Sequence, residues 1–203
     1  SETQHNYIGR WYDMVQASVD ECTPPLAAIQ RFLLEASPDV PEGDATGMPL
    51  ADLDRGLRDF QSWAHATLVA EPLSRLGHIV FGLYHPGDSG PDLGCDIDVE
   101  GCRYRDPNEW HPDEPRLLSG QMKSVWLRDW YRELTRSTQS GSSRLQCLAT
   151  VMLPLVFLAS SITAVWHQLL EDEILADLRD TDVYAIWSGG SLIRVIGGIT
   201  RPT

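Results

Sequence analysis

Residues 95–105 read Cys-Asp-Ile-Asp-Val-Glu-Gly-Cys-Arg-Tyr-Arg, and this stretch decides which class of fold the chain adopts. Apolar and polar residues alternate over 95–99 and again over 102–105, as they do in strands with one buried face. Glu100-Gly101 lies between the two runs and predicts a two-residue turn, because glycine tolerates the positive φ angles that such turns need. The stretch is therefore expected to form an antiparallel β-hairpin.

Folding this hairpin about Glu100-Gly101 assigns its two faces. One face carries Cys95, Ile97, Val99, Cys102 and Tyr104. On the other face, Asp98 is expected opposite Arg103 and Asp96 opposite Arg105, and such pairs favour a register by about 0.2–1 kcal/mol each. Cys95 and Cys102 would lie ~13 Å apart along the ladder, which is too far for a disulfide.

Two other segments carry strand signals. Residues 78–84 are rich in β-branched and aromatic side chains. Residues 183–187 and 192–196 flank the turn sequence Ser-Gly-Gly-Ser at 188–191, which predicts a second hairpin. Both of its strands are apolar on both faces, so we expect them to be central in the sheet.

The remaining segments show apolar residues at helical spacing. Helices are predicted at about 8–19, 24–36, 50–71, 119–136 and 154–171, with a short one near 174–178. Thr23 is expected to cap the second helix, with prolines in its first turn. We therefore expect one α+β domain over 1–203, in which N-terminal helices (about 4–72) pack on a mostly antiparallel sheet (within about 76–199) with further helices.

Charge and hydropathy exclude some classes of partner. The chain has 203 residues and a formal net charge of −13, which repels the phosphate backbone of a nucleic acid. The apolar run 147–166 is interrupted by Pro154 and followed by acidic residues, so we interpret it as a buried core helix and expect no membrane association. The start of the chain lacks a secretory signal and the four cysteines form no C-x-x-C, which points to a reducing cytoplasm.

No local motif identifies a reaction. The six histidines form no H-E-x-x-H, the sequence has no G-x-S-x-G, and no glycine-rich phosphate loop is present. We therefore assign no catalytic residue, metal or cofactor, and the oligomeric state stays open. One alternative is an enzyme whose site is assembled from loop residues His85, Asp88, Glu109 and His111. Another is a structural subunit of a larger assembly, which would expose an apolar patch.

The loop at 106–115 is the strongest candidate for a docking site. It is acidic and punctuated by proline, and it carries one large aromatic side chain, Trp110. The residues expected to meet a basic protein partner are Trp110, Asp106, Glu109, Asp113 and Glu114, since aromatic anchors ringed by charge are typical of fast, tight interfaces. The alternative is that Trp110 packs inward near Tyr104 and is part of the core.

Three stretches resemble poorly characterised bacterial proteins of an immunity-protein-like family. They are Phe81-Gly82-Leu83, then 96–101 (Asp-Ile-Asp-Val-Glu-Gly), then 106–110 (Asp-Pro-Asn-Glu-Trp). The terminal hairpin at 183–196 is also similar. The resemblance implies a cytoplasmic, non-enzymatic inhibitor of a bacterial toxin, and it implies no catalytic residues.

Overall fold

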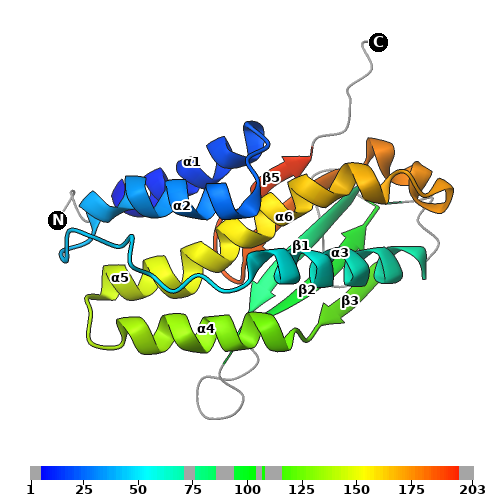
Figure 1. The fold of residues 1–203 in the computed structure, drawn as a ribbon. Helices are drawn as coiled ribbons and strands as arrows, with labels where there is room; N and C mark the ends of the chain where they lie inside the picture. Colours follow the sequence, from blue (N-terminus) through cyan, green and yellow to red (C-terminus); the bar gives the residue numbers. More distant parts are fainter. Residues whose placement is uncertain (1–5, 71–75, 86–93, 104–106, 108–115, 197–203) are drawn as a thin grey trace.

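The computed structural model describes residues 6–70, 76–85, 94–103, 107 and 116–196, and its elements form one α+β body (Figure 1). The strands are β1 (His78–Tyr84), β2 (Asp96–Cys102), β3 (Leu118–Met122), β4 (Asp182–Trp187) and β5 (Ile193–Ile196). They form one sheet in the order β3-β2-β1-β4-β5, in which only the β1–β4 contact is parallel. The expected α+β class and the mostly antiparallel sheet are therefore confirmed.

Along the chain, helices come before, between and after the strands of this sheet. Three of them precede it, namely α1 (Asn6–Asp20), α2 (Pro25–Ala36) and α3 (Leu53–Val69), and α4 (Val125–Thr138) follows β3. One long helix comprises α5 (Ser143–Cys147), a π-helical turn η5 (Leu148–Met152) and α6 (Leu153–Leu169). Short 3₁₀ helices lie at η2 (Ser37–Asp39) and η6 (Glu173–Asp180).

Three predicted helix starts are wrong. The helix expected from about 154 continues α5 and η5 and therefore begins at Ser143. Thr23 does not cap α2: the N-cap is Pro24, which has no side-chain hydrogen bond. The helix expected from 119 begins only at Val125, because residues 118–122 form the edge strand β3. The Oγ of Ser124 accepts a hydrogen bond from the Leu127 amide at 3.2 Å, so this serine marks the true start of α4.

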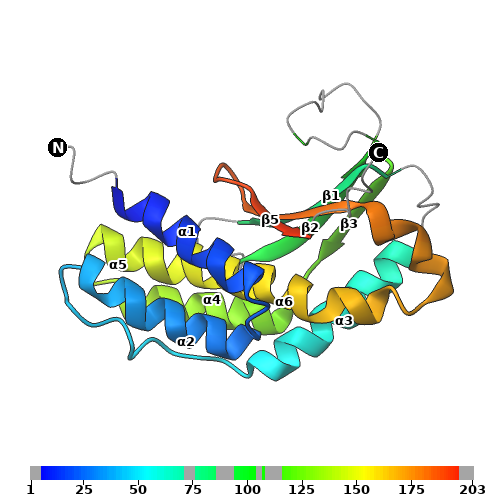
Figure 2. The same cartoon turned by 90° about the horizontal axis from the view of Figure 1, so that it is seen from above.

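The helices cover one face of the sheet only (Figure 2). Helix α6 lies in the middle of this layer and contacts α1, α2 and α3 as well as β1, β4 and β5. It is buried and apolar over most of its surface, and only Ala164, His167 and Gln168 near its end are exposed. Within the described residues, Ser143–Leu169 is the one helix long and apolar enough to cross a membrane, and its most apolar part is mostly buried in this core.

The predicted hairpin over 95–105 is wrong at its turn. Residues 96–102 form one uninterrupted strand, in which Glu100 lies opposite Val80 and Gly101 opposite Ile79. Gly101 serves a close approach instead of a turn, because a Cβ there would lie 2.8 Å from side-chain atoms of Leu118 and Leu76. Asp98 therefore lies opposite Gly82 and Gln121 and not opposite Arg103. Asp96 lies opposite Tyr84, and its predicted partner Arg105 is outside the described residues.

The alternation within this stretch is nevertheless confirmed up to residue 99. Ile97 and Val99 are each 1% exposed and face the helical layer, and Asp98 between them points to the other face. The terminal hairpin also forms, as β4 and β5. Only β4 is central, because β5 is an edge strand, so the expectation that both strands are central is half wrong.

A buried ion pair fixes helix α4 to the sheet. Asp96 at the start of β2 is completely buried. Its two carboxylate oxygens accept hydrogen bonds from Nε and Nη2 of Arg128 at 2.7 and 2.6 Å, which is the bidentate geometry that suits arginine. Gly94 leaves room for this arginine, since a Cβ on Gly94 would lie 2.8 Å from its Cγ.

Candidate binding surfaces

The predicted docking residues lie outside the described residues. These residues are Trp110, Asp106, Glu109, Asp113 and Glu114. The structure shows where the chain segment that contains them leaves the sheet and where it rejoins it. β2 ends at Cys102 and β3 begins at Leu118, which pairs with Gly101. Both ends of the segment are therefore at one corner of the sheet, beside strand β2.

Of the proposed enzyme site, only His85 is described. Its Nδ1 lies 3.0 Å from the carbonyl oxygen of Gly94, and its Nε2 lies 3.3 Å from the hydroxyl of Tyr131. Its ring also makes edge contacts with Tyr131 and Trp187. These contacts join the end of β1 to α4 and β4. The other three residues of that site, Asp88, Glu109 and His111, lie outside the described residues.

Two neighbouring carboxyl groups, those of Asp98 and Glu100, lie on the sheet face opposite the helices. No described helix covers this face (Figure 2). Alternation along the strands brings together Val80, Gly82 and Tyr84 from β1, Asp98 and Glu100 from β2, Ser119 and Gln121 from β3, and Tyr184 and Ile186 from β4. We call this set the open sheet face. It combines two carboxylates with two tyrosines and neutral polar groups.

Asp98 lies at the centre of the open sheet face. Its cross-strand neighbour is Gly82, and a Cβ on Gly82 would overlap Oδ1 of Asp98. Glycine is therefore needed here so that the carboxyl group can lie flat over β1. Two shallow hollows of about 250 and 370 Å³ flank this carboxyl group, and Tyr84, Asp98 and Glu100 line both.

The pKa of Asp98 is raised to about 6, first by burial and second by the nearby charge of Glu100. Backbone amides and the more distant Arg116 oppose this shift. Glu100, in contrast, forms an ion pair with Arg116 at 2.6 Å. One carboxylate of this pair thus has a counterion, while its neighbour titrates close to neutral pH.

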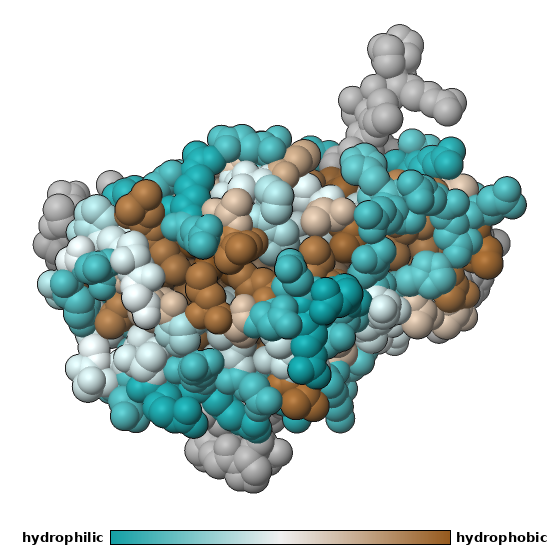
Figure 3. All heavy atoms as spheres, in the orientation of Figure 1, coloured by the Kyte–Doolittle hydropathy of each residue, from teal (hydrophilic) through white to brown (hydrophobic). Residues whose placement is uncertain are grey.

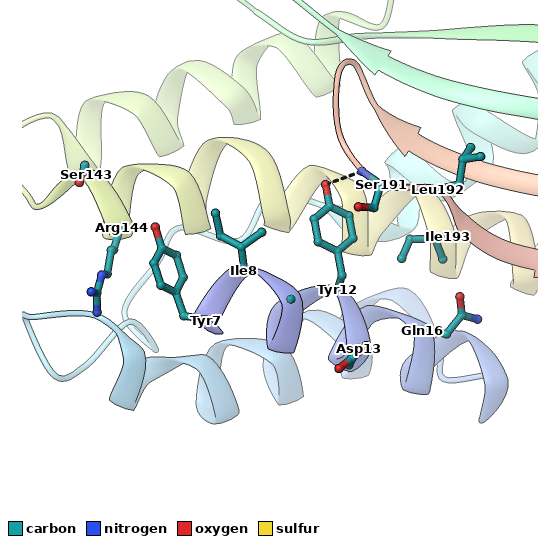
Figure 4. Close-up of a pocket in the computed structure, with 11 residues that line it drawn as sticks. Tyr7, Ile8, Tyr12, Asp13, Gln16, Ser143, Arg144, Ser191, Leu192 and Ile193 are labelled. Carbon is teal, nitrogen blue, oxygen red and sulfur yellow. Dashed lines mark hydrogen bonds between the residues drawn. The ribbon is translucent and has the colours of Figure 1, made fainter. Parts of the chain in front are cut away.

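A larger cleft of about 810 Å³ lies between α1, the start of α5 and the β4–β5 turn (Figure 4). Its walls come from three distant segments: α1, the start of α5, and the β4–β5 turn with β5. The guanidinium of Arg144 lies 4.6 Å from the ring centroid of Tyr7, in cation–π geometry. The amide of Ser191 donates to the hydroxyl of Tyr12 at 3.3 Å, which fastens the turn to α1.

A second hollow of about 440 Å³ continues this cleft, since both are lined by Ile8, Tyr12 and Ser191. Its other walls include Cys147, Val151 and Met152, which belong to or adjoin the π-helical turn. Burial raises the pKa of the Cys147 thiol, so this cysteine stays protonated and has little nucleophilic character. The cleft thus has a polar half and an apolar half and offers no activated nucleophile.

Sequence reasoning did not find this cleft. Residues 7–16, 143–152 and 187–193 carry no shared motif, and nothing in the local patterns shows that they meet. Of the acidic residues of the open sheet face, Asp98 was recognised by its alternation but was predicted to pair with Arg103, and Glu100 was predicted to lie in a turn. Within the described residues, no group of three or more His, Cys, Asp or Glu side chains is placed to hold a metal ion.

The helical side of the molecule exposes some apolar side chains. Leu26 and Leu34 of α2 are 46% and 66% exposed. Figure 3 shows hydrophobic residues gathered where α2 lies, interrupted by hydrophilic ones. The hypothesis of a structural subunit in a larger assembly therefore stays a prediction, with α2 as its contact surface.

Comparison of the chain with protein-family models, with curated proteins and with solved structures finds no match.

Proposed function

We propose that this protein is a non-enzymatic binding protein, an immunity-type inhibitor that binds a bacterial toxin in the cytoplasm. Its ligand would be a basic surface of that toxin. The observation that carries the proposal is the open sheet face, on which Asp98 and Glu100 lie between the β1 strand with Tyr84 and the neutral polar strand β3, with no described helix above them. The formal net charge of −13 supports the same class of partner.

Electrostatics give such an inhibitor speed as well as selectivity. An acidic face attracts a basic partner at long range and raises the rate of association by about 10–10³-fold at low salt. It also repels nucleic acids, so it is selective for positively charged partners. The tyrosines supply rigid apolar area beside the carboxylates, as in the hot spots of many interfaces.

The protonation of Asp98 adds a specific expectation. Burial, and after it the charge of Glu100, makes its carboxyl group hard to ionise, and among the described residues it has no ion pair of its own. An arginine or lysine of a bound partner would favour the ionised form and lower the pKa of Asp98. Binding at a pH below about 6 should then release a proton, and affinity should rise with pH through this range.

The loop at 106–114 remains the predicted second contact. Its segment leaves the sheet after Cys102 and rejoins it at Leu118, at the corner next to Glu100 and Arg116. A partner bound to the open sheet face near this corner would meet the loop too. Trp110 is then the expected anchor, ringed by Asp106, Glu109, Asp113 and Glu114.

Co-purification tests the proposal. The chain is expressed together with the product of the neighbouring gene, and we expect a stable complex and loss of the toxicity of that product. Asp98→Asn should weaken the complex, whereas Asp177→Asn, which removes the same charge from an exposed site on η6, should not. A neighbouring product that is neither toxic nor bound would remove the main support for the proposal.

A further inference from the structure

The two edges of the sheet are built differently. At the β5 edge, the side-chain amide of Gln16 occupies the outward backbone groups of Arg194: Nε2 donates to its carbonyl oxygen at 2.9 Å and Oε1 accepts from its amide at 3.2 Å. The register of β5 also shifts between Val183 and Tyr184. A capped, irregular and charged edge of this kind cannot add another strand.

The β3 edge has none of these devices. β3 pairs with β2 in unbroken register, and among the described residues no strand lies on its other side. The strand contains neither proline nor a charged residue, since the nearest charges, Arg116 and Lys123, lie beyond its two ends. Ser119 and Gln121 are exposed. Regular, uncharged edges present unpaired backbone groups that another strand can join.

We propose that β3 pairs with β3 of a second copy of this chain, antiparallel about a two-fold axis at Gly120. The sequence of the strand, Leu-Ser-Gly-Gln-Met, is complementary to itself in this register. Leu118 lies opposite Met122 of the second copy, and Ser119 lies opposite its Gln121. Glycine, the least bulky residue, lies opposite itself. The two five-stranded sheets then form one continuous sheet.

The register also preserves both faces of the sheet. Leu118 and Met122 are buried toward the helical layer at 1% and 8% exposure, so each apolar residue continues the apolar face of the other copy. A shift of the pairing between the two copies by one residue would turn the second sheet over. Ser119 and Gln121 of the second copy would then lie on the same side as the helical layer of the first copy. Helix α3 lies beneath the junction, since Thr67 is the nearest side chain to a Cβ on Gly120.

Charge does not oppose this pairing, although each copy has a net charge of −13. Asp98 and Glu100 lie one strand inward, next to Gln121 and Ser119. From Asp98 to Glu100 of the second copy there are three strand spacings, about 14 Å. The Debye length is about 8 Å at physiological salt, so this repulsion is largely screened. A basic strand from another protein would instead meet Arg116 and Lys123 at the two ends of β3.

Sedimentation equilibrium of the full chain, at about 10 µM to 1 mM, tests the proposal. We expect a mass that rises from one copy toward two. Ser119→Lys/Gln121→Lys places like charges opposite each other at both pairs and should weaken association at least tenfold. Ser119→Lys/Gln121→Glu places opposite charges at the same two pairs without changing the net charge. This variant should associate several-fold more tightly than the parent chain.

The control is Gln139→Lys/Ser140→Lys, which makes the same two substitutions at exposed positions after α4. It lowers the net negative charge by the same amount, so it should associate at least as well as the parent chain. A single-copy mass throughout the concentration range would overturn the proposal. So would equal association of the two double-lysine variants, with both folded by circular dichroism.

Discussion

Asp98→Asn should stabilise the protein at neutral pH, although it removes a charged residue. In the folded chain the pKa of Asp98 is raised from 3.8 to about 6, first by burial and then by Glu100. The folded state therefore holds this proton more tightly than the unfolded state, so stability falls as pH rises from about 4 to 6. Above pH 6 both states are ionised and the whole penalty is present.

The size of this penalty follows from the shift. About two pKa units correspond to at most about 3 kcal/mol, and solvent screening at a partly exposed group lowers this to about 1–2 kcal/mol. Asparagine keeps the shape and an acceptor oxygen but does not ionise. We expect Asp98→Asn to raise the melting temperature by about 2–8 °C at pH 7.5 in a chain of this size.

Thermal unfolding of both proteins from pH 4.5 to 8 is the assay. The difference in melting temperature should grow with pH and level off above about pH 6.5, where Asp98 is ionised in both states. Asp177→Asn is the control for the loss of one negative charge, and it should show no such profile. A stabilisation that is equal at all pH values, or a destabilisation at pH 7.5, would refute this reasoning.

Three further changes test the contacts that build the sheet and the docking site. Arg128→Met leaves Asp96 buried without its counterion and should lower the free energy of unfolding by about 3–5 kcal/mol in denaturant titrations, and a loss below about 1 kcal/mol would contradict the buried pair. Gly82→Ala should destabilise the parent chain, because the added methyl group would overlap the carboxyl group of Asp98. In a chain that already carries Asp98→Ala, the same substitution should cost much less stability, and equal losses in the two chains would show a different cause. Trp110→Ala should weaken partner binding by about 2 kcal/mol or more with little change in melting temperature, whereas a large drop in melting temperature would show that Trp110 is part of the core.

Local patterns predicted the elements that have one dominant signal. Residues 78–84 and the hairpin around 188–191 formed as expected, because β-branched residues and a glycine-rich turn leave few alternatives. Gly101 misled the prediction because glycine permits both a turn and a close approach of neighbouring strands. Only the packing of Leu118 and Leu76 decides between them. Long-range contacts of this kind are not encoded in a five-residue window.

The edge strand β3 was missed for a related reason. Leu118 and Met122 are four residues apart, a spacing that suits one face of a helix and also two like-facing positions of a strand. The apolar residues from Val125 onward extended the predicted helix backwards to residue 119, over most of β3. Similarly, Asp98 was recognised as an outward-facing residue, but the raised pKa depends first on its burial in the folded sheet and second on the charge of Glu100.

Titration of the purified chain with the product of the neighbouring gene tests the central claim most directly. Isothermal titration calorimetry at pH 7.5, at several salt concentrations, compares the parent chain with Asp98→Asn and Asp177→Asn. We predict affinity that falls with salt, and an Asp98→Asn protein that is more stable and yet binds at least tenfold more weakly, while Asp177→Asn binds like the parent. Binding that Asp98→Asn leaves unchanged would contradict a docking role for the open sheet face.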